Sequence, residues 1–311
     1  MRNTLGKIAA YLGIALILGA AVKISPAAEE YEFRGDGLYI GRTTVDELLK
    51  TYQIYNYNDY IYIKDWKYPP IFLTQMPDDF TELKDPQLRN KLFLQIIGPL
   101  ALKVNETLEF ERMDIRLLED KFSREHNLTP EEEKQIEEMA KKYDIFTRMK
   151  GERRYAILLK ELLMRVDKVP PSLLMGVAAI ETDWGTNRPI REANSLYKEL
   201  IWYSDEPGLQ PENEPDKTYK IKIFPSLYES MLSYAHKINT GVNYDQVRFL
   251  RKEISDRDQP VFGRTLAHAM IFDSNLKNFA GLLDYTITFY ELINWDEAEL
   301  GEIDLPSATN E

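Results

Sequence analysis

One glutamate, Glu181, ends an apolar run at a place where a carboxylic acid could donate a proton. The run extends from Leu173 to Ile180 and contains no charged or polar side chain. Pro170 and Pro171 precede it, and proline suits the first turn of a helix because its missing N–H has no partner there. We therefore expect a buried helix with Glu181 at its C-terminal end.

The end of a buried helix gives a carboxylate unusual surroundings. Loss of water and the negative end of the helix dipole both disfavour its ionised form, as a general acid working near neutral pH requires. Trp184 would supply an apolar wall, and Gly185 permits a sharp exit from the helix. The alternative is that Glu181 is an ordinary solvated residue at a helix end.

Other kinds of catalytic site are not indicated. The three histidines, His126, His236 and His268, are far apart and lack the spacing of metal ligands, so we expect no metal site. The chain has no cysteine, which excludes disulfides, cysteine-based zinc sites and thiol nucleophiles. The sequence has neither a glycine-rich phosphate loop nor a Gly-X-Ser-X-Gly elbow. We expect no cofactor.

The 311-residue chain is acidic, with 51 acidic and 39 basic residues and a formal net charge of -12. Its length allows one large domain or two modest ones. The charge argues against nucleic acid or an anionic membrane surface as the main partner, and it also serves plain solubility.

The N-terminus has the zones of a bacterial export signal. Arg2 and Lys7 precede the apolar residues 8–22, and small residues follow up to Ala28. We expect residues 1–28 to be a signal peptide, or an uncleaved anchor that holds the protein to the inner membrane through residues 8–22. Either places the protein in the periplasm or cell envelope. The alternative is a short buried helix.

The elements that must position Glu181 are mostly helical. We expect a linker over residues 29–43, a helical region over 44–165, a second region over 166–295 and an acidic tail over 296–311. Thr44 and Thr129 each precede a glutamate at capping-box spacing and predict helix starts. Apolar spacing predicts three further helices: Pro86–Phe110 with a kink or break at Pro99, Glu111–Arg124 and Glu152–Arg165.

Two segments indicate the β structure. Tyr219–Phe224 alternates with period two, which predicts a half-buried strand. Residues 52–68 are rich in aromatic side chains and are expected to pair with it in a hairpin, either as a packing surface or as a platform for sugars. The predicted fold class is α+β, predominantly helical, with one small β-hairpin.

Two motifs, Glu181-Thr182-Asp183-Trp184-Gly185 and Asn194-Ser195-Leu196-Tyr197, resemble the glucosaminidase family of flagellar peptidoglycan hydrolases. The run Tyr219–Asn239 is most similar to the family's Bax-like branch, and the resemblance covers roughly 44–290. It implies a lysozyme-like catalytic domain over 166–295 with an N-terminal helical extension, and cleavage of N-acetylglucosaminyl bonds in peptidoglycan glycan strands.

The resemblance also implies roles for individual residues. Glu181 would protonate the glycosidic oxygen, and water would attack with help from a second carboxylate or from the substrate's N-acetyl group. The family carries its second carboxylate on the hairpin, where we favour Glu206 and keep Glu212, Glu214 and Asp216 as candidates. The implied substrate-binding residues are Trp184, Asn194, Tyr197, Tyr219, Phe279 and Tyr285.

Three positions depart from the family pattern. Lys198 stands where glycine is usual, and Gly241-Val242 replaces a His-Pro pair after Asn239-Thr240. Phe279 occupies a late tyrosine position and has no hydroxyl to bind substrate or orient water. These departures keep two alternatives open: an envelope protein that binds glycan in the same groove without cleaving it, and a lytic transglycosylase, which needs one acid and no positioned water.

Overall fold

The computed structural model describes the chain except for residues 1–30, 62–63, 203–204, 213–217, 271–277 and 304–311. The expected signal peptide or anchor, residues 1–28, lies outside this part. Among the described residues, no helix combines the length and the apolar character needed to cross a membrane.

The fold is α+β and predominantly helical, as predicted. The helices are α2 (Val45–Ile54), α3 (Pro86–Glu125), α4 (Pro130–Lys142), α5 (Glu152–Arg165), α6 (Pro171–Glu181), α7 (Arg188–Ala193), α8 (Leu227–Thr240), α9 (Asp245–Ser255), α10 (Gly263–Ala267) and α11 (Phe279–Phe289). The strands are β1 (Tyr31–Arg34), β2 (Gly37–Ile40), β3 (Lys67–Tyr68), β4 (Ile71–Leu73), β5 (Leu200–Trp202), β6 (Gly208–Leu209), β7 (Tyr219–Lys222) and β8 (Glu299–Leu300).

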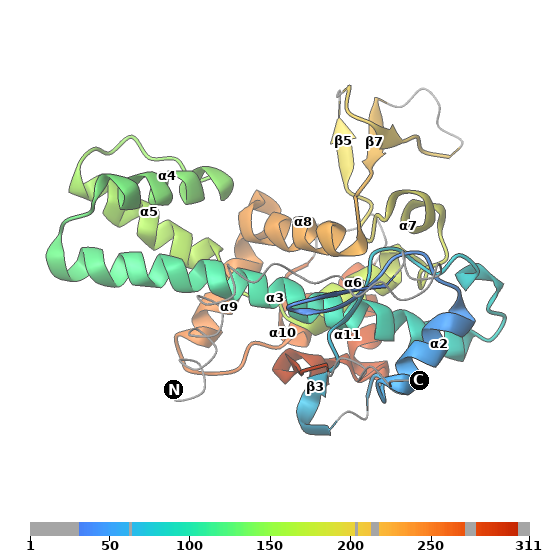
Figure 1. Ribbon diagram of the computed structural model, residues 1–311. Helices are drawn as coiled ribbons and strands as arrows, with labels where there is room; N and C mark the ends of the chain where they lie inside the picture. The colour runs from blue at the N-terminus through green and yellow to red at the C-terminus, as the bar shows by residue number, and fades with distance from the viewer. Residues whose placement is uncertain (1–30, 62–63, 203–204, 213–217, 271–277, 304–311) are drawn as a thin grey trace.

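Helix α3 crosses the molecule as one element of 40 residues, so the prediction of two helices is wrong (Figure 1). Asp85 caps its start by accepting the Gln87 N–H at 2.9 Å. Pro99 lies inside the helix and is buried, between the buried Gly98 and Leu100. Packing on both sides therefore offsets the hydrogen bond that proline removes.

The linker expected over residues 29–43 is also wrong from Tyr31 onward, while residues 29–30 lie outside the described part of the chain. Strand β1 pairs antiparallel with β2, and β2 pairs in parallel with β4. Leu38 and Ile40 are buried, while most of β1 stays exposed. Gly37 permits the close approach, because a Cβ there would meet the Pro70 carbonyl oxygen at 2.3 Å. The polar residues of this segment cover one edge of a sheet whose other strands enter the core.

Strand β7 forms as expected, but its partner is not the aromatic segment. It lies between β5 and β6 in an antiparallel three-stranded sheet. Tyr52, Tyr57 and Tyr68 of the aromatic segment are buried, and Tyr68 stacks on Trp295 with ring centroids 3.6 Å apart. These buried rings are packing residues and present no surface to a sugar.

The buried apolar residues form two clusters. The larger surrounds α6 and takes in the N-terminal half of α3, α8 and α11. The smaller joins the C-terminal half of α3 to α4 and α5, from Ile115 to Val166. Figure 1 shows α4 and α5 beside one end of α3, while α7 and the β5–β7 sheet stand at the other. The chain therefore passes from the larger cluster to the smaller one within α3 and returns between Val166 and Val169, beside the predicted boundary after residue 165.

Candidate active site

Helix α6 holds Glu181 on a rigid base. Every residue from Pro171 to Ala179 is buried, which confirms the predicted core helix. Gly176 brings α11 close, because a Cβ there would meet Leu283 Cδ1 at 2.7 Å. The last residue of α6 is therefore placed by packing along the whole helix.

Asp296 secures the other end of α6. Its carboxylate accepts the Ser172 N–H at 2.9 Å, the Ser172 hydroxyl at 2.7 Å and the Gly263 N–H at 2.9 Å. Burial nevertheless raises the pKa of Asp296 to about 6, against the effect of these hydrogen bonds. The predicted acidic tail, residues 296–311, thus begins at a buried residue. Strand β8 lies within it and pairs with β3.

Glu181 reaches the surface but is not free. Its side chain is 14% exposed, and the Lys198 ammonium lies 3.4 Å from its Oε2 atom. An ammonium group at this distance attracts the carboxylate oxygen and occupies the atom that a substrate would have to reach. Lys198 itself is 41% exposed, so the cation sits on the solvent side of the acid.

The turn after Glu181 is strained. Asp183, Trp184 and Gly185 have φ angles of 50°, 56° and 82°, three successive residues in the left-handed region. Thr182 supports the turn by donating to the Ala178 carbonyl at 2.6 Å and accepting the Gly185 N–H at 2.9 Å. Such strain persists only where surrounding structure enforces it, and it gathers at functional sites.

Two further contacts fix the exit of the chain. Asn187 donates its side-chain amide to the Glu181 carbonyl at 2.7 Å. Gly185 packs so tightly that an added Cβ would meet Phe93 Cδ2 at 2.7 Å. The backbone around the acid is therefore held from α3 as well as from α7.

The predicted groove residues Asn194 and Tyr197 serve mainly to position the next loop. Asn194 ends α7 in the left-handed region, with φ 49°, and donates to the Phe224 carbonyl at 3.2 Å. Tyr197 is buried; it stacks on Tyr234 at 3.9 Å and donates its hydroxyl to the Leu174 carbonyl at 3.2 Å. Their neighbour Lys198 also has a left-handed backbone, with φ 46°.

A row of aromatic rings begins at Trp184. The Trp184 and Tyr290 ring centroids are 4.4 Å apart, Tyr290 and Phe289 are 5.0 Å apart, and Phe289 and Tyr285 are 5.4 Å apart. Phe289 and Tyr285 are 62% and 57% exposed. The row therefore runs from the turn beside Glu181 to the solvent-facing side of α11.

The remaining predicted binding residues lie on different elements and do not form one surface. Phe279 is buried at the start of α11 and presents no surface to a ligand. Tyr219 is half-buried on β7, and its ring lies 4.9 Å from that of Trp202, which is 54% exposed. This pair places aromatic surface on the small sheet that stands above α7 (Figure 1).

Two of the candidate second carboxylates, Glu206 and Glu212, lie on the loops of that sheet. Glu206 is exposed between β5 and β6, and its backbone carbonyl accepts a hydrogen bond from Lys220 at 3.0 Å. Glu212 lies 3.7 Å from Arg188 of α7. Glu214 and Asp216 are outside the described residues. In the described part of the chain, no group of three or more potential ligands could hold a metal ion.

Sequence reasoning missed the contact of Lys198 with Glu181 and the positions of Tyr290 and Trp202. Lys198 could have been suspected, since it stands at a glycine position close to the acid in sequence. Tyr290 had no such signal, because its neighbour Trp184 is distant along the chain. Rings brought together by tertiary packing leave no local pattern.

Comparison with known proteins identifies a curated relative and a solved structure with similarity to this chain. No protein-family model matches the chain. The chain is 28% identical over 182 residues to Protein bax of Escherichia coli (strain K12), a match that covers 58% of this chain and 62% of that protein. The chain thus matches less than two thirds of its relative's length.

The solved structure is the catalytic domain of the autolysin Auto from Listeria monocytogenes. It is 16% identical, and the match covers 58% of this chain and 87% of that domain with a TM-score of 0.29. A TM-score this low does not establish a common fold.

Proposed function

We propose that this chain is a peptidoglycan hydrolase that cleaves N-acetylglucosaminyl glycosidic bonds, with Glu181 as the general acid. The observation that carries the proposal is the position of Glu181. Its side chain is 14% exposed at the end of a helix that is buried from Pro171 to Ala179, and a strained turn follows it. The motif resemblance and the similarity to Protein bax support the same assignment.

In this mechanism, Glu181 protonates the glycosidic oxygen while the sugar develops oxocarbenium character. As the glycosidic bond breaks, water attacks the anomeric carbon and Glu206 takes its proton; alternatively the substrate's own N-acetyl oxygen attacks first, and water opens the resulting ring while the Glu181 carboxylate takes its proton. The Lys198 ammonium must first move away from Oε2, because an ion-paired carboxylate is a poor proton donor. Lys198 is partly exposed on a long, flexible side chain, so an entering sugar can displace it.

Sugar rings would bind along aromatic surface. Tyr285 and Phe289 expose adjacent rings on α11, and Trp202 with Tyr219 does so on the small sheet. Aromatic faces pack well against the C–H faces of sugars, while the hydroxyl of a tyrosine can bond a polar substituent. We place the glycan strand against these two surfaces, with the scissile bond at Glu181.

The proposed setting is the periplasm or cell envelope. The basic start of the chain, the apolar residues 8–22 and the small residues that follow support export, with or without retention as a membrane anchor. The partner in this setting is the glycan strand of peptidoglycan. The acidic net charge of -12 supports the expectation that nucleic acid is not a partner.

One observation favours a second function, a glycan-binding protein that does not cleave. The Lys198 ammonium lies 3.4 Å from the acid at a position where the resembling family has glycine. If the ion pair persists when glycan is bound, Glu181 is blocked from the glycosidic oxygen and the protein only holds the strand. A lytic transglycosylase would instead use Glu181 alone and form an internal anhydro ring.

Mass spectrometry of purified sacculi after digestion tests these functions. New reducing N-acetylglucosamine ends support the hydrolase, and 1,6-anhydro ends support the transglycosylase. Intact sacculi that still bind the protein support the binding module. Glu181→Gln should abolish either cleavage, while Glu131→Gln on the exposed start of α4 serves as a matched control. Full cleavage by Glu181→Gln would refute the assignment.

A further inference from the structure

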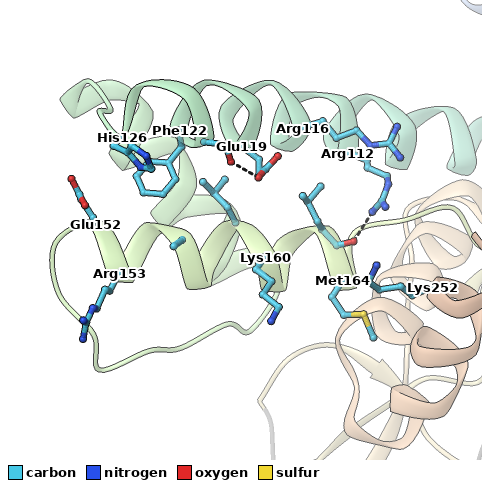
Figure 2. A pocket seen from close by; sticks show the side chains of 14 residues that line it. Arg112, Arg116, Glu119, Phe122, His126, Glu152, Arg153, Lys160, Met164 and Lys252 are labelled. Atoms are coloured by element: carbon cyan, nitrogen blue, oxygen red, sulfur yellow. Dashed lines mark hydrogen bonds between the residues drawn. The ribbon is translucent and has the colours of Figure 1, made fainter. Parts of the chain in front are cut away.

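A second candidate binding site lies on the helical end of the molecule, away from Glu181. It is a groove of about 680 Å³ between the C-terminal half of α3 and helix α5. Figure 2 shows Arg112, Met164 and Lys252 at one end, and His126 with Glu152 at the other. The groove follows α3 from Arg112 to His126, which is about 20 Å of helix.

The groove is basic although the chain is acidic. Its lining has five basic side chains, Arg112, Arg116, Arg153, Lys160 and Lys252, against two acidic ones, Glu119 and Glu152. Within the described part of the chain, no carboxylate forms an ion pair with Arg116, Arg153 or Lys160. These three cations are exposed and available to an anionic ligand.

Arg112 is a fixed cation at one end of the groove. It donates to the carbonyls of Leu163 and Val166 at 2.7 and 2.5 Å, and lies 3.5 Å from the Asp167 carboxylate. Its buried Nε atom has no hydrogen-bond partner among the described residues. A guanidinium held in this way keeps its charge in place without a ligand to order it.

The floor of the groove is apolar. Phe122 and Leu159 are buried, Leu163 and Met164 are half-buried, and Ala156 adds a small exposed side chain. A ligand that fits must therefore place negative charge at the rim and small apolar groups on the floor. Neutral sugars are a poor match, because the one phenyl ring of the lining is buried.

We propose that this groove binds short, carboxylate-bearing peptides of the same cell-wall polymer whose glycan is cleaved at Glu181. The inference rests on the proposed function for the polymer's identity. About five or six residues of extended peptide span 20 Å, so one short peptide fills the groove. Free carboxylates pair with Arg116, Arg153 and Lys160, and small side chains contact Ala156 and Met164. An anionic membrane fits poorly, because the apolar residues form a floor and do not protrude.

Such a groove would hold the polymer while the glycan is cleaved elsewhere on the same molecule. Two attachment points on one polymer raise the effective concentration of the second contact. The groove should therefore increase the affinity for large, peptide-bearing substrate and have no effect on the affinity for short soluble sugars.

The test compares binding to intact sacculi with binding to peptide-free glycan strands prepared with an amidase. Glu181→Gln is the background, so cosedimentation measures binding without digestion. Arg116→Glu/Lys160→Glu should weaken sacculus binding about tenfold at low salt. Lys50→Glu/Lys67→Glu changes the charge equally at two exposed positions away from the groove and should weaken it less than about twofold. Thermal unfolding confirms that each variant folds.

The outcomes separate the two proposals. Equal binding of peptide-free strands and intact sacculi, or equal losses in both double variants, would overturn the peptide groove. A competition experiment in which phosphatidylglycerol vesicles displace the protein from sacculi would also overturn it. Cleavage of a short chito-oligosaccharide by the Arg116→Glu/Lys160→Glu protein with Glu181 restored should match the unsubstituted protein. If the unsubstituted protein cleaves no glycan at all, the proposed function fails, whatever the binding to sacculi shows.

Discussion

The Lys198 ammonium lies 3.4 Å from Oε2 of Glu181, at the solvent side of the candidate acid. The same lysine has a φ of 46°, a backbone conformation that favours glycine. The chain thus keeps the backbone that glycine would adopt at this position and adds a cation to it. The contact makes Lys198 the first position to change.

Lys198→Gly should raise the cleavage of sacculi severalfold, because it frees the Oε2 atom of Glu181 from the ion pair and opens it to substrate. It should also leave stability unchanged or raise it by about 1 kcal/mol, since glycine adopts a left-handed φ without strain. Quantified muropeptide release and thermal unfolding measure both effects. Lys198→Arg keeps the charge and should not activate; lower release from the glycine variant would show that Lys198 assists the reaction.

Glu181→Gln should lower muropeptide release by at least about a hundredfold, since general acid catalysis contributes factors of that order. The substitution keeps the shape of the side chain and breaks a partly exposed ion pair, so stability should change by less than about 1 kcal/mol. Initial rates and thermal unfolding of the same preparations test both statements. Unfolding well below the temperature of the native protein would make the loss of activity uninformative about the acid.

Tyr285→Ala and Phe289→Ala should each raise the KM for glycan by a factor of about two to ten with little change in kcat. Both rings are exposed, so truncation should leave the fold stable. Phe146→Ala is the control, because Phe146 is 85% exposed on the loop between α4 and α5. An effect on kcat alone would argue that the aromatic row acts on the reaction step and not on sugar binding.

Gly185→Ala should destabilise the protein by about 2 kcal/mol or more, because it combines a strained φ with a clash against Phe93. Gly151→Ala isolates the backbone contribution, since Gly151 has a φ of 58° but no atom lies near its added Cβ. Thermal or urea unfolding should therefore show a clearly larger loss for Gly185→Ala. Equal losses would mean that Phe93 moves aside at little cost.

Asp296 should make stability depend on pH between about 4 and 6. Its folded pKa is raised to about 6 from an ordinary 3.8, so the folded state binds the proton more tightly than the unfolded state. This contribution is fully present below pH 3.8 and is lost as pH rises through 6; it amounts to about 2 to 3 kcal/mol.

Asp296→Asn removes the titration and should abolish that part of the pH dependence. Its net stability should also fall, because the N–H groups of Ser172 and Gly263 bind different carboxylate oxygens, and the single amide NH2 would face one of these donors. Urea unfolding of both proteins across this pH range gives the difference directly. Parallel curves for the two proteins would contradict the raised pKa.

Features that depend on residues close together in the sequence could be predicted. The capping boxes at Thr44 and Thr129 form as expected, and so does the buried helix that ends at Glu181. In each case the signal and its structural result lie within about one helix. Local hydrogen bonds and the apolar run are the signals that indicate these elements.

Features that depend on distant residues could not be predicted. The pairing of β2 with β4, the stack of Tyr68 on Trp295 and the continuity of α3 through Pro99 each require a partner that the local pattern does not name. The same holds for the Lys198–Glu181 contact. The resembling family has glycine at this position, so Lys198 was recognisable as unusual. Only the folded chain shows that its side chain contacts Glu181.

The hydrogen bonds between Asp296 and Ser172 set an order of events during synthesis. The helix that carries Glu181 emerges from the ribosome more than a hundred residues before the carboxylate that holds its first turn. Until Asp296 has been added, the N-terminal end of α6 lacks that anchor. The helix that carries the candidate acid therefore gains this anchor at its first turn only after residue 296 has been synthesised.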